Sequence, residues 1–347
     1  MQSRRQQWRK SWVAFPLFLG IWGCAAGKSE IRTDSAGSVP KQAAEVPLVQ
    51  LSDAEFQTVG DRIVYLDGKT GKRVSEQALW QRLSESDFVL VGESHDQASH
   101  HRLQVRIIRK MQELKSETWE KTGVSQVIVG MEMVSWDRQQ ALDVYQKEEV
   151  DEQGLQAALE WETSWGYDFG LYEDVFKQAL KGGSKLIGIN APRSLVRAVA
   201  KQGIEDLNAE QKSQLPEMDL SNVNHKEIIR DVFEHHHPST ASGNAFDRFY
   251  TAQVLWDETM AEKSVDAYVS AAAENAVVVV LAGNGHVAGY DGIPNRIKRR
   301  LPTSKMITIV PLLLETGDDP SAVATEAVQS RIADVVMLEL PPIRLEM

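Results

Sequence analysis

Short apolar segments rich in valine and isoleucine recur along most of the chain, and some of them are continuously apolar. Apolar residues without polar alternation are typical of strands buried on both faces, as in a parallel sheet. We therefore predict six strands, over residues 88–91, 127–131, 185–189, 277–282, 306–310 and 335–340.

Helical patterns lie between these segments. Leu103, Ile107, Met111 and Leu114 recur at intervals of three or four residues, and residues 171–179 and 249–260 show the same spacing. Each pattern places one apolar stripe against a sheet. Strands that alternate with helices form βαβ units. The pattern therefore predicts an α/β fold with a mainly parallel sheet flanked by helices.

Two stretches depart from this alternation. Residues 60–75 contain Asp67-Gly68 and Thr70-Gly71, which predicts a small hairpin before the main sheet. Residues from about 204 to 270 combine long polar helical patterns with the turn-rich letters HHHPSTASGN. We expect residues 48–347 to form one α/β domain that carries a smaller helical insert over about 204–270.

The first 47 residues have a different character. Residues 1–10 are basic, and the uncharged residues 11–23 are shorter than the roughly 20 apolar residues of a spanning helix. This pattern fits a secretory signal peptide over residues 1–23. It ends in the letters IWGC, which resemble the bacterial lipobox and imply lipidation of Cys24. A plain signal peptide cut elsewhere is the alternative. Residues 24–47 are rich in serine, alanine and glycine, and are expected to form a flexible tether.

The charge balance limits the choice of partners. The formal net charge is −11, whereas binding to nucleic-acid phosphates needs a basic surface. We therefore expect no nucleic-acid partner. An acidic body also has no electrostatic attraction to anionic lipid, so attachment to a membrane would depend on the lipid at Cys24.

Polar side chains with useful chemistry follow four of the predicted strands. In open parallel sheets, ligands bind beyond the carboxyl ends of the strands, on loops that the sheet positions. The sequence therefore predicts one shared site at this edge, formed by His95, Glu132, Asn190, Arg193 and His286.

This set of residues permits only a few kinds of chemistry. Two imidazoles and a carboxylate hold a divalent metal or act as an acid–base pair. Arg193 suits a bidentate carboxylate, and Asn190 suits the orientation of a neighbour. Two structural alternatives stay open: Glu132 caps a helix that begins near Ser135, and Arg193 is its ion-pair partner.

Other histidines and aromatic residues give weaker signals. His100 and His101 lie beside Arg102, which favours a solvated basic helix face. His235 to His237 precede a proline and fit a loop, with one histidine available to a cofactor. The aromatic residues suit either a core or the face of a porphyrin, whose ferric iron a tyrosine can bind; they are Trp161, Trp165, Tyr167, Phe169 and Tyr172.

The order of these motifs resembles one family. The segments VLVGESHDQASHHRLQ, VIVGMEM, LIGINAPRSLVRAV, FYTAQVLWDETMA and VVVLAGNGHVAGYDGIP are similar to those of the ChaN-like haem-binding lipoproteins. That family belongs to a wider group with the Tiki and TraB-like proteins. The resemblance covers about residues 60 to 300.

The resemblance implies haem binding in iron uptake. The lipobox-like segment, with Ala25 after the cysteine, predicts a lipoprotein of the cell envelope on the outer membrane, facing the periplasm. The resemblance also implies a homodimer that encloses two haems, with a tyrosine as iron ligand. Tyr167 and Tyr172 are the candidate tyrosines, and His237 is a candidate contact on the second side. The candidate haem-binding set is His95, Glu132, Tyr167, Tyr172, Asn190, Arg193, His237 and His286.

The wider group implies an alternative function. In Tiki proteins two Gly-x-x-His turns, which this chain has at Gly92 to His95 and Gly283 to His286, accompany metal-dependent peptide hydrolysis. His95, Glu132 and His286 match that constellation and would hold a divalent metal. Glu93 or Glu132 would then serve as a third ligand or as the base for a metal-bound water.

Overall fold

The computed structural model describes residues 63–122, 126–236, 244–271, 276–315 and 317–339. The predicted signal peptide, the tether with Cys24, and His237 lie outside the described residues.

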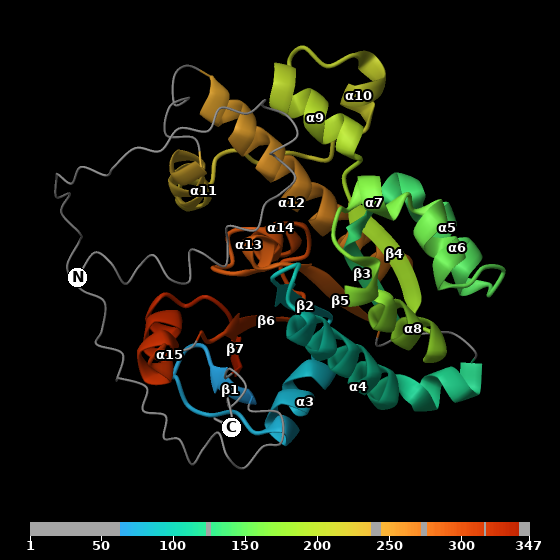
Figure 1. Cartoon of the computed structure of the whole chain (residues 1–347), viewed down its shortest axis with the longest axis vertical. Helices are drawn as coiled ribbons and strands as arrows, with labels where there is room; N and C mark the ends of the chain where they lie inside the picture. Colours follow the sequence, from blue (N-terminus) through green and yellow to red (C-terminus); the bar gives the residue numbers. More distant parts are fainter. Residues whose placement is uncertain (1–62, 123–125, 237–243, 272–275, 316, 340–347) are drawn as a thin grey trace, which may run out of the picture.

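A seven-stranded sheet forms the centre of the molecule (Figure 1). Its order is β1-β7-β6-β2-β5-β3-β4, and every neighbouring pair is parallel except β1 with β7. The strands are β1 (Ile63–Asp67), β2 (Phe88–Glu93), β3 (Val127–Ser135), β4 (Lys185–Asn190), β5 (Val277–Gly283), β6 (Met306–Leu313) and β7 (Val335–Glu339). All six predicted strands are present, and the mainly parallel α/β fold is confirmed.

The strands are apolar throughout because both faces of the sheet are covered. In β2, Phe88 and Leu90 belong to one hydrophobic core, and Val89 and Val91 belong to the other. Successive side chains of a strand point to opposite faces, so continuous apolarity is what two cores require.

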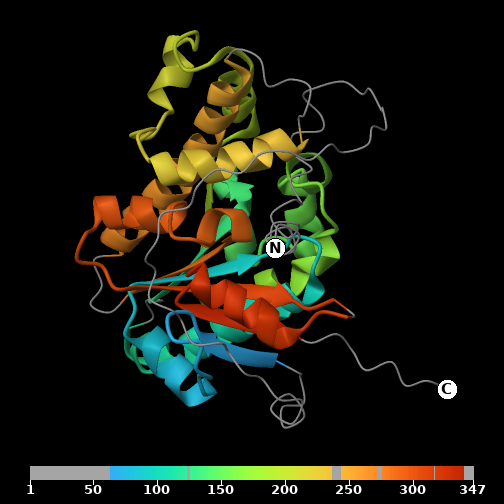
Figure 2. The same cartoon turned by 90° about the vertical axis from the view of Figure 1, so that its left-hand side faces the viewer.

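Two sets of helices cover these faces (Figures 1 and 2). The first core includes residues of α9 (Arg193–Gln202), α12 (Ala245–Ser270), α14 (Ile293–Arg300) and α15 (Pro320–Gln329). The second includes residues of α3 (Glu76–Ser84), α4 (Ala98–Thr122), α5 (Gln139–Gln146), α6 (Glu152–Ala158) and α8 (Glu173–Lys181). The stripe predicted on α4 is buried at Leu103, Ile107 and Met111 but ends before Leu114, which is 41% exposed.

The segment at 60–75 is part of the main sheet. Residues Asp67 to Gly71 form the expected turn, which a single antiparallel bridge between Leu66 and Arg73 closes. However, β1 pairs antiparallel with β7 over its whole length. The expectation of a hairpin standing before the sheet is therefore corrected: β1 is an edge strand of the sheet itself.

Three helices occupy residues 204–270: α10 (Ala209–Ser213), α11 (Val223–His236) and α12. A small third cluster joins α11 to the first part of α12, with Phe233 against Phe246. Further along, α12 packs on the sheet, and residues 252–261 are buried on all sides. This helix therefore links the helical segment to the main core.

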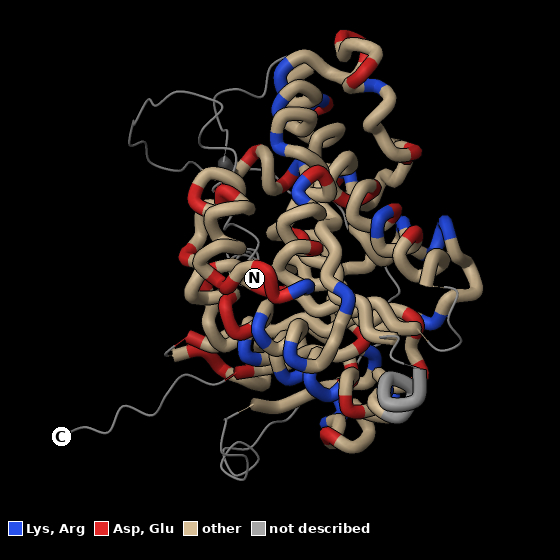
Figure 3. Tube along the Cα trace, turned by 90° about the vertical axis from the view of Figure 1, so that its right-hand side faces the viewer, with Lys and Arg blue, Asp and Glu red and all other residues tan. Residues whose placement is uncertain are grey.

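The described helices carry acidic and basic residues mixed together, as the face drawn in Figure 3 shows. Among the described residues, none of the helices is long and apolar enough to cross a membrane.

Candidate functional site

The strand order brings the predicted polar residues together. Strands β2, β5, β3 and β4 are consecutive in the sheet, so their carboxyl ends are neighbours. Glu93 at the end of β2 lies opposite Gly283 at the end of β5. Glu132 lies near the end of β3. Its backbone carbonyl accepts a hydrogen bond of 2.9 Å from the side-chain amide of Asn190 in β4.

Glu93 is a fully buried carboxylate that receives four hydrogen-bond partners. Its Oε1 lies 2.7 Å from His95 Nδ1 and accepts from the Tyr172 hydroxyl at 2.7 Å. Its Oε2 lies 3.1 Å from His101 Nδ1 and accepts from the Gln104 amide at 2.5 Å. Burial raises the pKa of Glu93, but the hydrogen bonds and charges of His101 and His95 more than offset burial and hold it well below its usual value.

His101 is positioned to be a cation. Its Nδ1 faces Glu93, and its Nε2 lies 3.2 Å from the backbone carbonyl of His95. Because both nitrogens face acceptors, both carry protons. Burial lowers the pKa of His101, and the contacts with Glu93 raise it by more. Burial likewise lowers the pKa of His95, and the hydrogen bond to Glu93 together with the charges of Glu132 and Glu93 raises it by more.

A second buried group contains His286 between two carboxylates. His286 belongs to α13 (Asn284–Val287), and its Nδ1 lies 2.6 Å from Asp257 Oδ1 on α12. Its Nε2 lies 3.3 Å from Glu132 Oε1. Burial lowers the pKa of His286, but the charges of Glu132 and Asp257 raise it to about 10. His286 is therefore an imidazolium that neutralises part of a buried acidic pair.

Gly283 allows the two groups to meet. Its N–H donates to Glu132 Oε2 at 2.5 Å. A Cβ placed on Gly283 would lie 2.9 Å from His95 Cε1, 3.2 Å from His95 Nε2 and 3.6 Å from Glu132 Oε2. Real Cβ atoms avoid contacts under 3.0 Å, so a larger residue would displace the His95 ring. The glycine is therefore needed for the imidazole and the carboxylate to converge.

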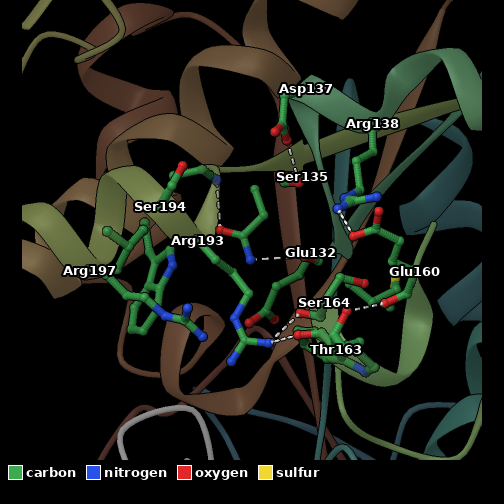
Figure 4. A pocket seen from close by; sticks show the side chains of 16 residues that line it. Glu132, Ser135, Asp137, Arg138, Glu160, Thr163, Ser164, Arg193, Ser194 and Arg197 are labelled. Atoms are coloured by element: carbon green, nitrogen blue, oxygen red, sulfur yellow. Dashed lines mark hydrogen bonds and ion pairs between the residues drawn. The ribbon is translucent and has the colours of Figure 1, made fainter. Parts of the chain in front are cut away.

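A cavity of about 320 Å³ opens beside Glu132 (Figure 4). Trp165, Asn190 and Trp256 are part of its wall, and Arg193 and Arg197 lie together on one side. The Arg193 guanidinium donates to the backbone carbonyls of Thr163 and Ser164, in α7 (Trp161–Ser164). Arg193 is therefore not an ion-pair partner of Glu132, and its pKa is lowered by burial and by Arg197.

The two candidate tyrosines differ in their surroundings. Tyr172 is fully buried, and its hydroxyl is bound to Glu93. Tyr167 is half-buried, with its ring 5.1 Å from that of His95 and 5.7 Å from that of Trp165. Burial and the nearby carboxylates of Asp96, Glu132 and Glu93 raise the pKa of Tyr167. The aromatic residues between 161 and 172 thus pack in the second core, with Tyr167 at its margin.

Two local interpretations of the sequence are corrected. His100 and His101 are 1% and 2% exposed, so they do not form a solvated face. Both point inward because α4 packs this side on the sheet, where Ser94 and Glu93 supply their partners. Glu132 does not cap a helix, because β3 continues to Ser135 and the helical turn η2 (Trp136–Arg138) begins after it.

Several residues of the site carry only a weak signal in the sequence because they lie within helices. Gln104 follows His100 and precedes Ile108 at helical spacing, so it lies on the buried stripe of α4. Asp257 follows the apolar residues Val254 to Trp256 but stands beside Glu258 and Thr259, so its position in the sequence is no clear sign of its role. His225 on α11 approaches the same carboxylate, with Nε2 3.4 Å from Asp257 Oδ2.

The side chains expected to be metal ligands make bonds to their neighbours instead. His286 directs one nitrogen at Asp257 and the other at Glu132, so it has no lone pair left for a metal. In the described part of the chain, no group of three or more His, Cys, Asp or Glu side chains is arranged to hold a metal ion. His95 and Glu132 both approach Gly283 closely.

Fold and site together define a parallel-sheet α/β protein with a buried histidine–carboxylate site at its strand ends. Residues 79–297 match the family of haem-binding uptake proteins of the Tiki superfamily, ChaN, and the chain belongs to this family. That stretch contains every described residue of the site, and the predicted resemblance is confirmed.

Known proteins agree at the level of the fold. The chain is similar to the solved structure titled "Cofacial heme binding to ChaN of Campylobacter jejuni", with a TM-score of 0.61. The match has 23% identity and covers 80% of this chain and 96% of that one. The chain is also 24% identical, over 271 residues, to the protein RETICULATA-RELATED 5, chloroplastic, of Arabidopsis thaliana. It spans 35% of the length of that relative.

Proposed function

We propose that this protein binds haem and serves haem iron uptake at the cell envelope. The observation that carries the proposal is the family match over residues 79–297, whose members are described as haem-binding uptake proteins. The likeness in fold to ChaN of Campylobacter jejuni, a structure titled for cofacial haem binding, agrees with it.

Tyr167 is the tyrosine best placed to contact the iron. Bound haem supplies a ferric centre, for which a tyrosine phenolate is a known ligand. Tyr167 is half-buried and lies among the rings of Trp165 and His95, which offer flat apolar surface. Tyr172, in contrast, is fully buried. The greater exposure of Tyr167 therefore favours it as the residue that contacts the iron.

Arg193 and Arg197 are the proposed contacts for the haem propionates. Guanidinium groups bind carboxylates in a bidentate manner, and both arginines lie on one wall of the cavity beside Glu132. Pockets that enclose drug-sized ligands measure roughly 300–1,000 Å³. At about 320 Å³ the cavity suits the propionate edge better than a whole porphyrin. The ring would then lie over the mouth of the cavity, exposed to a second chain.

That exposure fits the proposed homodimer, in which two chains enclose a pair of haems. Lipidation at Cys24 would hold the body at the membrane surface, where haem is passed between envelope proteins. Both features are part of the proposal and rest on the family resemblance and on the lipobox-like segment.

The test is a titration of the full chain with haemin, followed by absorbance in the Soret region and by size exclusion. We expect a saturable, shifted band and a larger species in the haemin-loaded sample. Tyr167→Phe should weaken binding by about tenfold or more, which corresponds to about 1.4 kcal/mol. Tyr268→Phe is the matched control, because its hydroxyl binds Asp87, which precedes β2, away from the strand-end site.

Each failure would have a definite meaning. If the wild-type chain shows no band shift with haemin, the proposed function is wrong. If Tyr172→Phe abolishes the band while Tyr167→Phe keeps it, haem binding stands but the assignment of the tyrosine is wrong.

A further inference from the structure

A hollow of about 400 Å³ lies at the edge of the sheet that carries β1. The turn after β1, the last turn of α3, the segment after α13 and the segment before β7 meet there (Figure 1). The hollow shares no lining residue with the cavity beside Glu132, which lies at β3 and β4 in the other half of the sheet. The polar and charged residues of its wall are Asp67, Lys69, Arg82, Tyr290, Arg331 and Asp334.

The two carboxylates of the hollow already have partners within the protein. Asp334 accepts hydrogen bonds from the Tyr290 hydroxyl at 3.0 Å and from the backbone N–H and the hydroxyl of Thr308, at 2.8 and 3.0 Å. Asp67 pairs with Arg82 at 2.9 Å and accepts further hydrogen bonds within its own turn. Neither carboxylate therefore depends on a further cation.

The cations of the hollow outnumber its carboxylates. Lys69 and Arg331 make no hydrogen bond or ion pair through their side chains within the described part of the chain. Arg82 pairs with Asp67, but 42% of its side chain is exposed and can meet a ligand. The chain as a whole has a formal net charge of −11, so this is a local reversal of charge. Such a reversal attracts anions to the hollow.

Two residues of the hollow have backbone conformations that favour glycine. Arg331 has a φ of 49° and Tyr290 a φ of 67°. Arg331 follows the C-cap residue of α15, a position that glycine commonly occupies. A residue that keeps this strain has a side chain with a task that glycine cannot perform. For Tyr290 that task is the hydrogen bond to Asp334, whereas the free guanidinium of Arg331 is left for a ligand.

The cations suit a phosphate monoester. Two guanidinium groups and one ammonium donate from three side chains, and a phosphate monoester has three terminal oxygens that share nearly two charges. A carboxylate has two oxygens and one charge, so it would leave part of this set without a partner. Small-molecule sites measure roughly 300–1,000 Å³. The hollow, at about 400 Å³, therefore has room for an organic group beside the phosphate.

We propose that this hollow binds the phosphate monoester group of an organic ligand, with Lys69, Arg82 and Arg331 on its oxygens. Soluble phosphate esters and lipids such as phosphatidic acid present the same terminal group, so the experiment has one arm for each source. The proposal does not depend on haem. Loss of phosphate binding and loss of haem binding are therefore separate outcomes.

The soluble arm is isothermal titration calorimetry of the full chain with phenyl phosphate, and with benzoate as a carboxylate on the same ring. We expect saturable binding of phenyl phosphate that weakens as the salt concentration rises. Benzoate should bind at least about tenfold more weakly.

The lipid arm is flotation with phosphatidylcholine vesicles, prepared with and without phosphatidic acid. Vesicle binding that requires phosphatidic acid and is lost in Arg331→Gly would assign the site to a lipid. Binding of phenyl phosphate without vesicle binding would assign it to a soluble ester.

Two variants remove a cation without disturbing the fold. Arg331→Gly deletes the guanidinium and places glycine at a left-handed φ, so it should unfold at the same urea concentration as the wild type. Lys69→Gln removes an exposed ammonium. We expect each to weaken binding of phenyl phosphate by about tenfold. The matched controls are Glu148→Gly, an exposed residue with a φ of 57° outside the hollow, and Lys72→Gln, exposed beside the same turn as Lys69.

Three results would overturn the proposal. The first is no binding of either phenyl phosphate or vesicles that contain phosphatidic acid. The second is equal affinity for phenyl phosphate and benzoate, which would show that the hollow does not select a phosphate. The third is normal binding of phenyl phosphate by both Arg331→Gly and Lys69→Gln, which would place the anion elsewhere, for example at Arg193 and Arg197.

Discussion

The buried histidines of the site lie in neutralising sets of single residues. His286 lies between Asp257 and Glu132, and His101 lies between Glu93 and a backbone carbonyl. Removal of one member of a buried pair is costly because it leaves the others without compensation. The stability of the site should therefore depend on individual protons, and hence on pH.

We predict that His286→Gln lowers the free energy of unfolding by about 3–5 kcal/mol near neutral pH, because Asp257 and Glu132 lose the cation between them. The folded pKa of His286 is about 10, above the ordinary value of 6.5. A group whose pKa is raised by folding stabilises the folded state fully at pH values below its ordinary pKa. This contribution is lost as the pH rises through its pKa in the folded state. The difference between variant and wild type should shrink as the pH approaches 10.

Urea unfolding of both proteins at several pH values between 6.5 and 10 measures this difference. His235→Gln serves as the control, since that side chain is exposed. A difference that stays constant over this range would show that His286 is not the cation of the group.

At the scale of elements, one buried carboxylate joins two helices. Glu258 of α12 has no exposed surface and binds three arginines of α14. Its Oε1 also accepts from the backbone N–H of Asp219, in the segment before α11, at 3.0 Å. Glu258 follows Asp257 directly, so the contact that fixes α12 against α14 also positions the carboxylate that holds His286. The partners of Glu258 are Arg296, Arg299 and Arg300.

Glu258→Ala should lower the free energy of unfolding by about 3–5 kcal/mol, because it leaves the guanidinium of Arg296 buried with one carboxylate fewer. Glu262→Ala, one turn later on α12, is the control. Its carboxylate is 31% exposed and pairs only with Lys263, so we expect a change of less than about 1 kcal/mol. Equal midpoints for the two variants in chemical denaturation would contradict a structural role for Glu258.

At the scale of the whole molecule, the sheet is most protected at its centre. β2 and β5 are paired with strands on both sides and are buried along their whole length, whereas β1 pairs with the strand β7 on one side and has a single bridge to Arg73 on the other, among the described residues. Because β2 pairs directly with β5, the turns Gly92 to His95 and Gly283 to His286 become neighbours although they are distant in sequence. The best protected part of the fold is therefore the part that carries the site.

Hydrogen–deuterium exchange followed by mass spectrometry tests this distribution. We expect the amides of β2 and β5 to exchange only through global unfolding, and those of β1 to exchange at least about tenfold faster through local opening of the edge. Equal protection of β1 and β5 would show that the edge strand opens only with the whole sheet.

Six of the seven strands and the class of the fold could be predicted from the amino-acid sequence alone. Continuous runs of valine and isoleucine require burial on both faces, and this requirement depends only on neighbouring residues. For the same reason the polar residues at the strand ends, such as His95, Glu132 and His286, are identifiable from the amino-acid sequence alone. Parallel strands point the same way, so whatever follows them gathers at one edge.

The hydrogen bonds and ion pairs between these residues depend on the tertiary structure. The partners of the histidines come from helices, with Gln104 on α4 and Asp257 on α12, and the side of a helix that faces a strand end depends on packing between distant segments. The strand order is likewise a non-local property. It placed His286 between Glu132 and Asp257, so that carboxylates face both nitrogens of a side chain that the sequence alone could equally assign to a metal.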